Sequence, residues 1–203
     1  MGKMIISKHE QNTPEWKNER LGCPSSSEFK RIVTSKGVRS DSRQKYMDEL
    51  ASEIITGEPT AKPKLKAFDL GHEREQENID LYQFRNGVEI TQVGFCWKDE
   101  KKLFGASPDT LVNEDGLMEA KNSNGPQQIN RILYGWTASE HHRQAQGQML
   151  VTGRKYCDVV SYCRGMKTVT VRFERDEEFL KKLEVELILF HRDLMKLVDE
   201  IRQ

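Results

Sequence analysis

Long apolar runs are missing from this chain of 203 residues, in which 36% are hydrophobic and 32% are charged. The longest apolar stretches, such as residues 187–190, fall far short of the roughly 20 residues that cross a bilayer. Residues 1–6 contain no long apolar stretch and no small-residue cleavage site, so we expect no signal peptide and no membrane-spanning segment. The composition predicts one soluble, intracellular, globular domain with a sizeable core.

Cysteines and an excess charge of one sign are also scarce. The four cysteines form no Cys-x-x-Cys pair, which argues against a zinc ribbon or a cysteine-ligated iron–sulfur cluster and favours small buried hydrophobes. Lys and Arg together number 32, and so do Asp and Glu. This balance counts against a protein that coats nucleic acid without specificity, although it allows one that binds a few phosphates at a defined site.

The balanced total hides an uneven distribution of charge. Residues 68–120 contain 12 acidic and 5 basic side chains, whereas residues 121–172 contain 8 basic and 2 acidic ones. Such an arrangement is expected where carboxylates gather around a cation and positive surface lies nearby for an anion. Surface helices that simply differ in charge would produce the same pattern, and charge alone does not separate the two interpretations.

Hydrophobic periodicity predicts an α/β fold with a central mixed sheet flanked by helices. Helical patterns, with capping residues or terminal glycines, cover residues 25–33, 41–55, 68–84, 137–151 and 177–201. Strand patterns cover residues 88–97, 103–107, 110–112, 117–121, 156–163 and 168–173. Three strands joined by short turns and then a helical crossover are typical of a mixed sheet covered by helices.

The strongest functional pattern is Ser107-Pro108-Asp109, a short turn, and then Glu119-Ala120-Lys121. Side chains alternate along a strand, so Glu119 and Lys121 should share one face. If the turn at 113–116 pairs Val112 with Leu117, Asp109 lies diagonally near Glu119. Two close carboxylates need a cation, and oxygen ligands suit Mg²⁺ or Mn²⁺. With a lysine beside them, they indicate metal-dependent cleavage of a phosphodiester.

This pattern resembles the PD-(D/E)XK nuclease superfamily, and the chain is similar to phage-type alkaline exonucleases of the lambda exonuclease family. The resemblance extends over most of the chain. Its motifs are Trp16, Arg20-Leu21-Gly22, Ser25-Ser26-Ser27-Glu28-Phe29, Leu70-Gly71 with Glu75, Ser107-Pro108-Asp109, Glu119-Ala120-Lys121, Gln144-Ala145-Gln146 and Leu150-Val151-Thr152.

The resemblance also implies a role for each site residue. Asp109 and Glu119 would bind Mg²⁺ together with the backbone carbonyl of Ala120, and Lys121 would position the attacking water. Glu75 would support a second metal or its waters, and Gln146 would contact metal-bound solvent or the scissile nucleotide. A pocket for the terminal 5′-phosphate would consist of Arg20, Ser27 and Ser107, because a guanidinium and hydroxyls suit phosphate oxygens.

From the family we further expect 5′-to-3′ digestion of linear double-stranded DNA to 5′-mononucleotides, leaving 3′ overhangs for recombination. The resemblance implies a ring-shaped homotrimer, a single-strand annealing protein as partner, and the cytoplasm of a bacterial host as location. A single exonuclease domain would span residues 1–203, with a helical part at 1–66, a nuclease core at 67–175 and a C-terminal helix at 176–203.

Two alternatives remain open at this point. One is a structure- or sequence-specific endonuclease of the same fold, and the other is a non-catalytic DNA-binding protein that keeps the fold. The intact Asp109, Glu119 and Lys121 argue against the second. The sequence departs from the family at Thr110, where glycine is usual, and at Ala120, where a larger apolar residue is usual. Neither departure removes a catalytic group.

Overall fold

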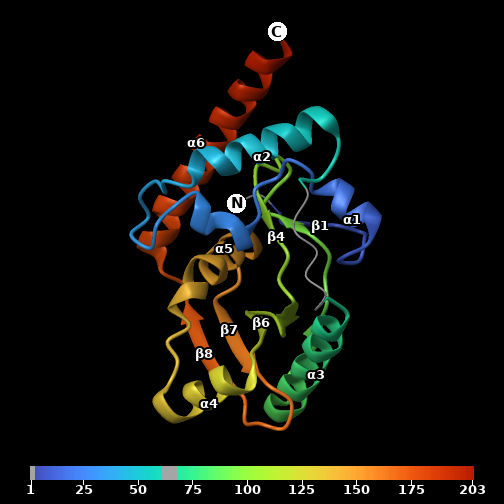
Figure 1. Cartoon of the computed structure of the whole chain (residues 1–203), viewed down its shortest axis with the longest axis vertical. Helices are drawn as coiled ribbons and strands as arrows, with labels where there is room; N and C mark the ends of the chain where they lie inside the picture. Colours follow the sequence, from blue (N-terminus) through green and yellow to red (C-terminus); the bar gives the residue numbers. More distant parts are fainter. Residues whose placement is uncertain (1–2, 61–67) are drawn as a thin grey trace.

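The computed structural model describes residues 3–60 and 68–203, and the side chains of residues 68–72 lie outside that description. Figure 1 shows a molecule in which helices surround two sheets. The helices are α1 (Pro14–Glu19), η1 (Ser26–Arg31), α2 (Arg43–Thr56), α3 (Phe68–Asn86), α4 (Gly125–Tyr134), η2 (Ser139–His141), α5 (His142–Thr152) and α6 (Glu177–Arg202). The strands are β1 (Ile5–Ile6), β2 (Ile90–Thr91), β3 (Cys96–Trp97), β4 (Gly105–Ala106), β5 (Thr110–Val112), β6 (Gly116–Asn122), β7 (Tyr156–Tyr162) and β8 (Val169–Glu174).

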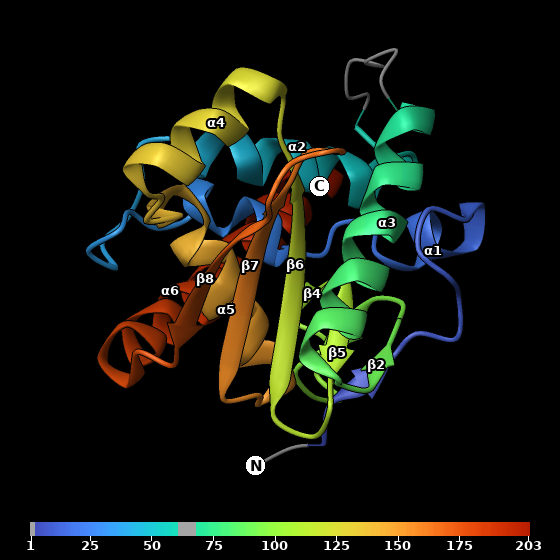
Figure 2. The ribbon, with the colours of Figure 1, turned by 90° about the horizontal axis from the view of Figure 1, so that it is seen from below.

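The larger sheet has the order β2-β5-β6-β7-β8. Its central pair, β6 and β7, is parallel, and the other pairs are antiparallel. Helix α3 covers one face and α5 the other (Figure 2). The predicted α/β class with a mixed sheet flanked by helices is therefore confirmed.

Alternation along β6 and β7 divides the core of this sheet between its two faces. Leu117 and Val159 pack with Met149 of α5, whereas Met118 and Val160 pack with Ile79 of α3. Residues of β6 with odd numbers consequently face α5. This parity places Glu119 and Lys121 under that helix.

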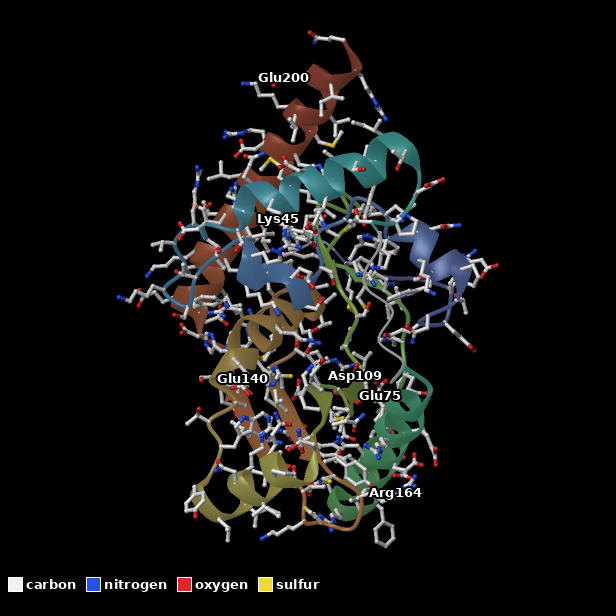
Figure 3. All side chains as sticks on the ribbon, in the orientation of Figure 1. Lys45, Glu75, Asp109, Glu140, Arg164 and Glu200 are labelled. Atoms are coloured by element: carbon white, nitrogen blue, oxygen red, sulfur yellow. The ribbon has the colours of Figure 1, made fainter. Side chains whose placement is uncertain are left out.

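Polar contacts fix α3 on the opposite face. Tyr82 donates a hydrogen bond of 2.6 Å to Asp158, and Asn78 donates one of 3.0 Å to the carbonyl of Val160. At the far end of β7, Arg164 forms ion pairs with Glu73 and Glu77 (Figure 3). Successive turns of α3 are thus attached to successive positions of β7, which sets where the helix presents its remaining side chains.

The predicted strand at 88–97 is in fact two strands that belong to different sheets. β2 joins the larger sheet, while β3 joins a three-stranded sheet of order β1-β3-β4. The chain changes direction near Gly94, where an added Cβ would lie only 2.3 Å from the carbonyl oxygen of His9. Close contact between this segment and the N-terminal segment separates the two sheets.

The predicted hairpin register is wrong by one residue. Val112 pairs with Gly116 and Leu111 with Leu117, so Val112 does not pair with Leu117. The turn therefore contains residues 113–115, with Asn113 at a φ of 44°. Asparagine adopts such a positive φ more readily than most residues other than glycine. Continued by one step, the observed register sets Asp109 opposite Glu119.

The predicted helices are present, but residues 26–31 form the 3-10 helix η1 without a capping bond from Ser25, and α1 is missing from the predictions. The segment 137–151 begins as the short η2, so the regular helix α5 starts only at His142, and no side-chain bond caps η2. Helix α4 is missing from the predictions, although Asn124 and Gln127 form a capping box at its start. Its apolar residues Ile129 and Leu133 face solvent, so the usual pattern of a core-facing helix is absent.

Helices α2 and α6 enclose the largest core cluster together with η1 and α5. Tyr46 of α2 stacks on Phe190 of α6, with ring centroids 5.7 Å apart. The proposed boundary between residues 66 and 67 lies outside the described residues. Within the part of the chain that is described, no helix is long and apolar enough to cross a membrane.

Candidate active site

Asp109 stands just before β5, at the point where the chain enters the larger sheet. Its Oδ2 atom accepts a hydrogen bond of 2.7 Å from the backbone N–H of Ala120 in β6. This bond ties the carboxylate to the strand that also carries Glu119 and Lys121. The hairpin between β5 and β6 therefore assembles the acidic pair that the sequence predicts.

Glu119 is buried, and both of its carboxylate oxygens have donors. Oε1 accepts hydrogen bonds from Lys121 Nζ at 2.7 Å and from Gln144 Nε2 at 2.6 Å, and Oε2 accepts one from Gln148. Gln144 also contacts the Lys121 ammonium through its own oxygen, at 3.3 Å. Residues four apart on a helix share a face, so α5 presents both glutamines to the end of β6.

The electrostatics of this cluster show an uncompensated negative charge. Burial raises the pKa of Asp109 well above its ordinary value, and repulsion from Glu119 and Glu75 raises it further. Burial also acts against the charged form of Lys121, but the carboxylates of Glu119 and Asp109 outweigh it and raise the pKa of that ammonium. Lys121 is thus a protonated donor, and one ammonium faces three carboxylates.

Glu75 approaches this cluster from α3 (Figure 3). Together with Asp109 it lines a cleft of about 540 Å³, whose other walls come from residues 6–12 and from the segment before β3. Gln11 closes one side by donating hydrogen bonds of 2.9 Å to the carbonyls of Val93 and Pro108. Asp109 and Glu75 therefore border an open space rather than sealed core.

His141 lies beside the same cluster, at the end of η2. Burial and the nearby charge of Lys121 lower its pKa to about 4, so the imidazole is neutral at physiological pH. Its ring meets Trp136 edge-on, with centroids 5.7 Å apart. A neutral ring here adds no positive charge to the site, and the cationic donor remains Lys121.

The three residues of the predicted phosphate pocket gather around the three-stranded sheet. Ser25 and Gly105 form a parallel β-bridge. Ser27 follows the first of these residues by two positions and Ser107 follows the second by two, so both leave the bridge in the same direction. Ser27 is exposed, whereas the hydroxyl of Ser107 is buried and has no hydrogen-bond partner within residues 3–60 and 68–203. An unpaired buried hydroxyl is costly and usually indicates a missing ligand or water.

Arg20 lies against aromatic rings of the same region. Its guanidinium carbon is 4.3 Å from the centroid of Trp16 and 5.6 Å from that of Phe95. Burial lowers the pKa of this guanidinium. Phe95 in turn packs on Gly105, where an added Cβ would meet the ring at 2.2 Å. The aromatic cage thus holds Arg20 next to β4.

The structure does not bring Gln146 to the acidic cluster. Its Nε2 atom donates to the carbonyl of Glu174 at 2.7 Å, and its Oε1 atom accepts from the N–H of Asp176 at 3.0 Å. It therefore joins α5 to the connection between β8 and α6. Gln144 and Gln148 occupy the predicted position instead, and their i, i+4 spacing beside Glu119 was the signal that could have identified them.

The model of the YqaJ-like viral recombinase domain matches residues 15–155. The chain belongs to this family. No curated protein gives a significant match. Among solved structures, the alkaline exonuclease LHK-Exo from Laribacter hongkongensis is 31% identical, with a TM-score of 0.82 over 94% of this chain and 96% of that one.

Two further structures extend the comparison. LHK-Exo in complex with dAMP is 32% identical, with a TM-score of 0.83 and coverage of 94% and 96%. A phage-related exonuclease from Haemophilus somnus 129PT is 14% identical over 88% of this chain and 96% of that one, with a TM-score of 0.68, and shows a shared fold. The expected kinship with the lambda exonuclease family is confirmed.

The acidic cluster of this viral recombinase family member suits a hard metal ion. No group of three or more His, Cys, Asp or Glu side chains converges as a ready metal cage among the described residues. Mg²⁺, however, commonly uses one or two protein carboxylates and completes its shell with waters and phosphate oxygens. Asp109, Glu119 and the backbone carbonyl of Ala120 offer such a donor set, and burial together with the neighbouring carboxylates raises the pKa of Asp109.

Proposed function

We propose that this chain is a Mg²⁺-dependent exonuclease that digests linear double-stranded DNA from its 5′ ends. It releases 5′-mononucleotides and leaves 3′ single strands for recombination by annealing. The observation that carries the proposal is the convergence of Asp109, Glu119 and Lys121 at the end of β6. Membership of a viral recombinase family and 31% identity with an alkaline exonuclease support a DNA exonuclease role. A relative studied with dAMP supports a nucleotide product.

In this proposal Asp109, Glu119 and the carbonyl of Ala120 hold Mg²⁺, for which Mn²⁺ can substitute. When bound, the metal supplies a more acidic water and stabilises negative charge on the phosphoryl group. Lys121 orients the attacking water as a hydrogen-bond donor, since its ammonium is protonated. Gln144 holds that ammonium in place. Glu75 supports a second metal or its waters from the other side of the cleft.

Arg20, Ser27 and Ser107 form the pocket for the terminal 5′-phosphate in this proposal. Two of them have polar groups that no protein atom uses in the described residues: the hydroxyl of Ser107 is unpaired, and Arg20 has no hydrogen-bond acceptor. A phosphate would satisfy both, because guanidinium and hydroxyl donors match its oxygens. Holding the terminal phosphate fixes which bond reaches the metal and so sets the polarity of digestion.

The same proposal includes the assembly. We infer a homotrimeric ring through which the DNA passes, and a single-strand annealing protein that receives the 3′ strand in the host cytoplasm. The viral recombinase description of the family supports a role in recombination. A closed ring also explains how a chain with no net charge keeps hold of its substrate, because electrostatic attraction to phosphates would be weak.

Digestion of linear duplex DNA tests the proposal most directly. Duplexes with and without a 5′-phosphate are incubated with the protein in Mg²⁺ and in EDTA, beside the variants Asp109→Ala and Asp199→Ala. Asp199 is an exposed carboxylate near the end of α6 and provides the matched control. We expect Mg²⁺-dependent loss of nucleotides from 5′-phosphorylated ends, retained in Asp199→Ala and abolished in Asp109→Ala.

Other results would contradict it. Equal digestion of circular and linear DNA, regardless of phosphate, would favour an endonuclease of the same fold. An absence of digestion with Mg²⁺ and with Mn²⁺ would leave a DNA-binding protein. Digestion from 3′ ends would retain the nuclease and overturn the polarity.

A further inference from the structure

Arginine side chains in this molecule almost always donate to a protein acceptor, and the exceptions are informative. Of the 14 arginines in the chain, 11 donate hydrogen bonds to side-chain or backbone oxygens. They are Arg31, Arg39, Arg43, Arg85, Arg131, Arg154, Arg164, Arg172, Arg175, Arg192 and Arg202. Arg74 is exposed, which leaves Arg20 and Arg143 as partly buried guanidinium groups without an acceptor among the described residues.

Arg143 is the second residue of α5, directly before the glutamine that contacts Lys121 and Glu119. Its Nε atom is buried and has no hydrogen-bond partner in residues 3–60 and 68–203. Water can reach only part of this side chain. Leaving a charged donor buried and unpaired is unfavourable. An anion from outside the protein would satisfy this donor.

The packing of α5 defines where that anion would lie. Gly147 is four residues after Arg143, and an added Cβ there would lie 2.5 Å from Phe29 and 3.2 Å from Ser26. Residues four apart share a helical face, so Arg143 is on the side of α5 that faces η1. Gln144 is about 100° further around the helix. Arg143 is thus on the side of α5 that faces η1, and it directly precedes Gln144, which contacts Glu119 of the acidic cluster.

We propose that Arg143 binds a backbone phosphate of the DNA strand next to the cleaved bond, at a subsite separate from the terminal 5′-phosphate. The inference rests on the proposed DNA substrate. A phosphodiester suits the position because residues 121–172, which include Arg143, hold only 2 acidic side chains against 8 basic ones. A guanidinium offers a planar pair of donors that matches two phosphate oxygens.

Binding as a function of salt concentration tests this inference. A fluorescent blunt duplex is titrated with wild type and variants in Ca²⁺ between 50 and 200 mM salt. Each phosphate contact adds about 0.9 to the slope of log affinity against log salt, so Arg143→Gln should lower that slope by about 1. We expect its affinity to fall about tenfold, the usual effect of losing one charge-assisted bond. Arg143→Lys should recover part of both.

Two further variants separate binding from folding. Arg143→Met keeps the apolar stem and removes the charge, so it should reproduce the effect of Arg143→Gln at an unchanged melting temperature. Arg39→Gln is the matched control, because Arg39 pairs with Glu186 of α6 on another part of the surface. It should bind DNA as the wild type does.

Digestion in Mg²⁺ distinguishes the two phosphate subsites. Arg143→Gln should raise KM for the duplex and retain the preference for 5′-phosphorylated ends, whereas Arg20→Gln should remove that preference. An unchanged affinity and slope in folded Arg143→Gln and Arg143→Met would overturn the inference. Loss of the end preference in Arg143→Gln would also overturn it, since Arg143 would then belong to the terminal pocket. If the wild type digests no DNA, the proposed function itself fails.

Discussion

The carboxylates of the acidic cluster differ in how far their surroundings compensate their charge. Within the described residues, the Ala120 N–H and the Lys121 charge are what offset burial and two carboxylate neighbours at Asp109. Glu119, by contrast, has donors on both oxygens. A cation would therefore stabilise Asp109 more than Glu119. Glu119 and Lys121 are already held in place by their hydrogen bonds.

Replacement of Asp109 should accordingly stabilise the protein when no metal is present. We expect Asp109→Asn to raise the free energy of unfolding in EDTA, because it removes the cost of ionising a buried carboxyl whose pKa is raised in the folded state. Asparagine keeps the acceptor for the Ala120 N–H and removes the repulsion. Activity should be lost. Thermal unfolding with and without Mg²⁺ checks this, because Mg²⁺ should stabilise only the wild type.

The pH dependence of that difference has a definite sign. The pKa of Asp109 is raised above its ordinary value of 3.8, so the folded state disfavours the charged form. The cost is present once the carboxyl ionises, and it disappears as the pH falls toward about 4. In EDTA the stability gap between Asp109→Asn and the wild type should therefore close on acidification. A gap that widens at low pH would contradict this account.

Two glutamines on one helix allow a matched comparison. Gln144→Leu should reduce kcat about tenfold or more, as removal of a supporting contact at a metal site commonly does, because it frees the Lys121 ammonium. Gln146→Leu should leave kcat unchanged and cost about 1–3 kcal/mol of stability, since it leaves backbone groups of Glu174 and Asp176 unpaired. Steady-state kinetics and chemical denaturation of both variants would show whether the two effects separate.

At the scale of elements, the contact between α5 and η1 depends on one glycine. An added Cβ at Gly147 would lie 2.5 Å from the buried ring of Phe29. We expect Gly147→Ala to destabilise the protein by about 1–3 kcal/mol, as overpacking usually does. Gly125→Ala is the control, since its Cβ would meet Met166 at an ordinary 3.6 Å. Melting temperatures would decide, and an equal effect of the two substitutions would refute the packing argument.

The sequence predicts elements best where their hydrophobic period is long. The regular period of α6 gives its bounds within one residue, and β5 is predicted as it stands. Helix α4 is not predicted because its buried residue is the polar Gln128, so its sequence lacks the apolar stripe of a core-facing helix. Gln128 forms hydrogen bonds with Ser123 and with the carbonyl of Lys167. The division of the 88–97 segment follows from contact with residues 7–9, and no local pattern encodes a contact over that distance.

The site residues, too, are predictable where a local sequence pattern brings them together. Asp109, Glu119 and Lys121 are close in sequence, and the strand period and one short turn suffice to bring them together. Gln146 is implied by the family resemblance, whereas the structure directs Gln144 to Glu119 of β6 and Gln146 to the connection between β8 and α6. Distances along one hairpin are thus predictable from sequence, whereas the rotation of a helix over a sheet is not.

For the whole molecule, the uneven charge along the sequence becomes a spatial arrangement. The acidic segment 68–120 supplies α3 and the carboxylates of the site, and the basic segment 121–172 supplies Lys121 and Arg164. The two meet across the sheet, where Arg164 pairs with Glu73 and Glu77. Charge that cancels in the total therefore attaches α3 through these ion pairs. In the proposed function, it also binds a cation beside an anion.

In the proposed function, that arrangement determines how the protein would remain bound to DNA. Because no large excess of positive charge is available, retention by electrostatics alone should fail as salt rises. We expect a native mass of three times the 23.6 kDa of one chain. Once digestion has begun, it should continue after a salt jump that prevents new binding, since a closed ring holds DNA by topology. Native mass spectrometry and a salt-jump digestion assay measure the two. A monomeric mass with equal resistance to salt would show that retention has another cause.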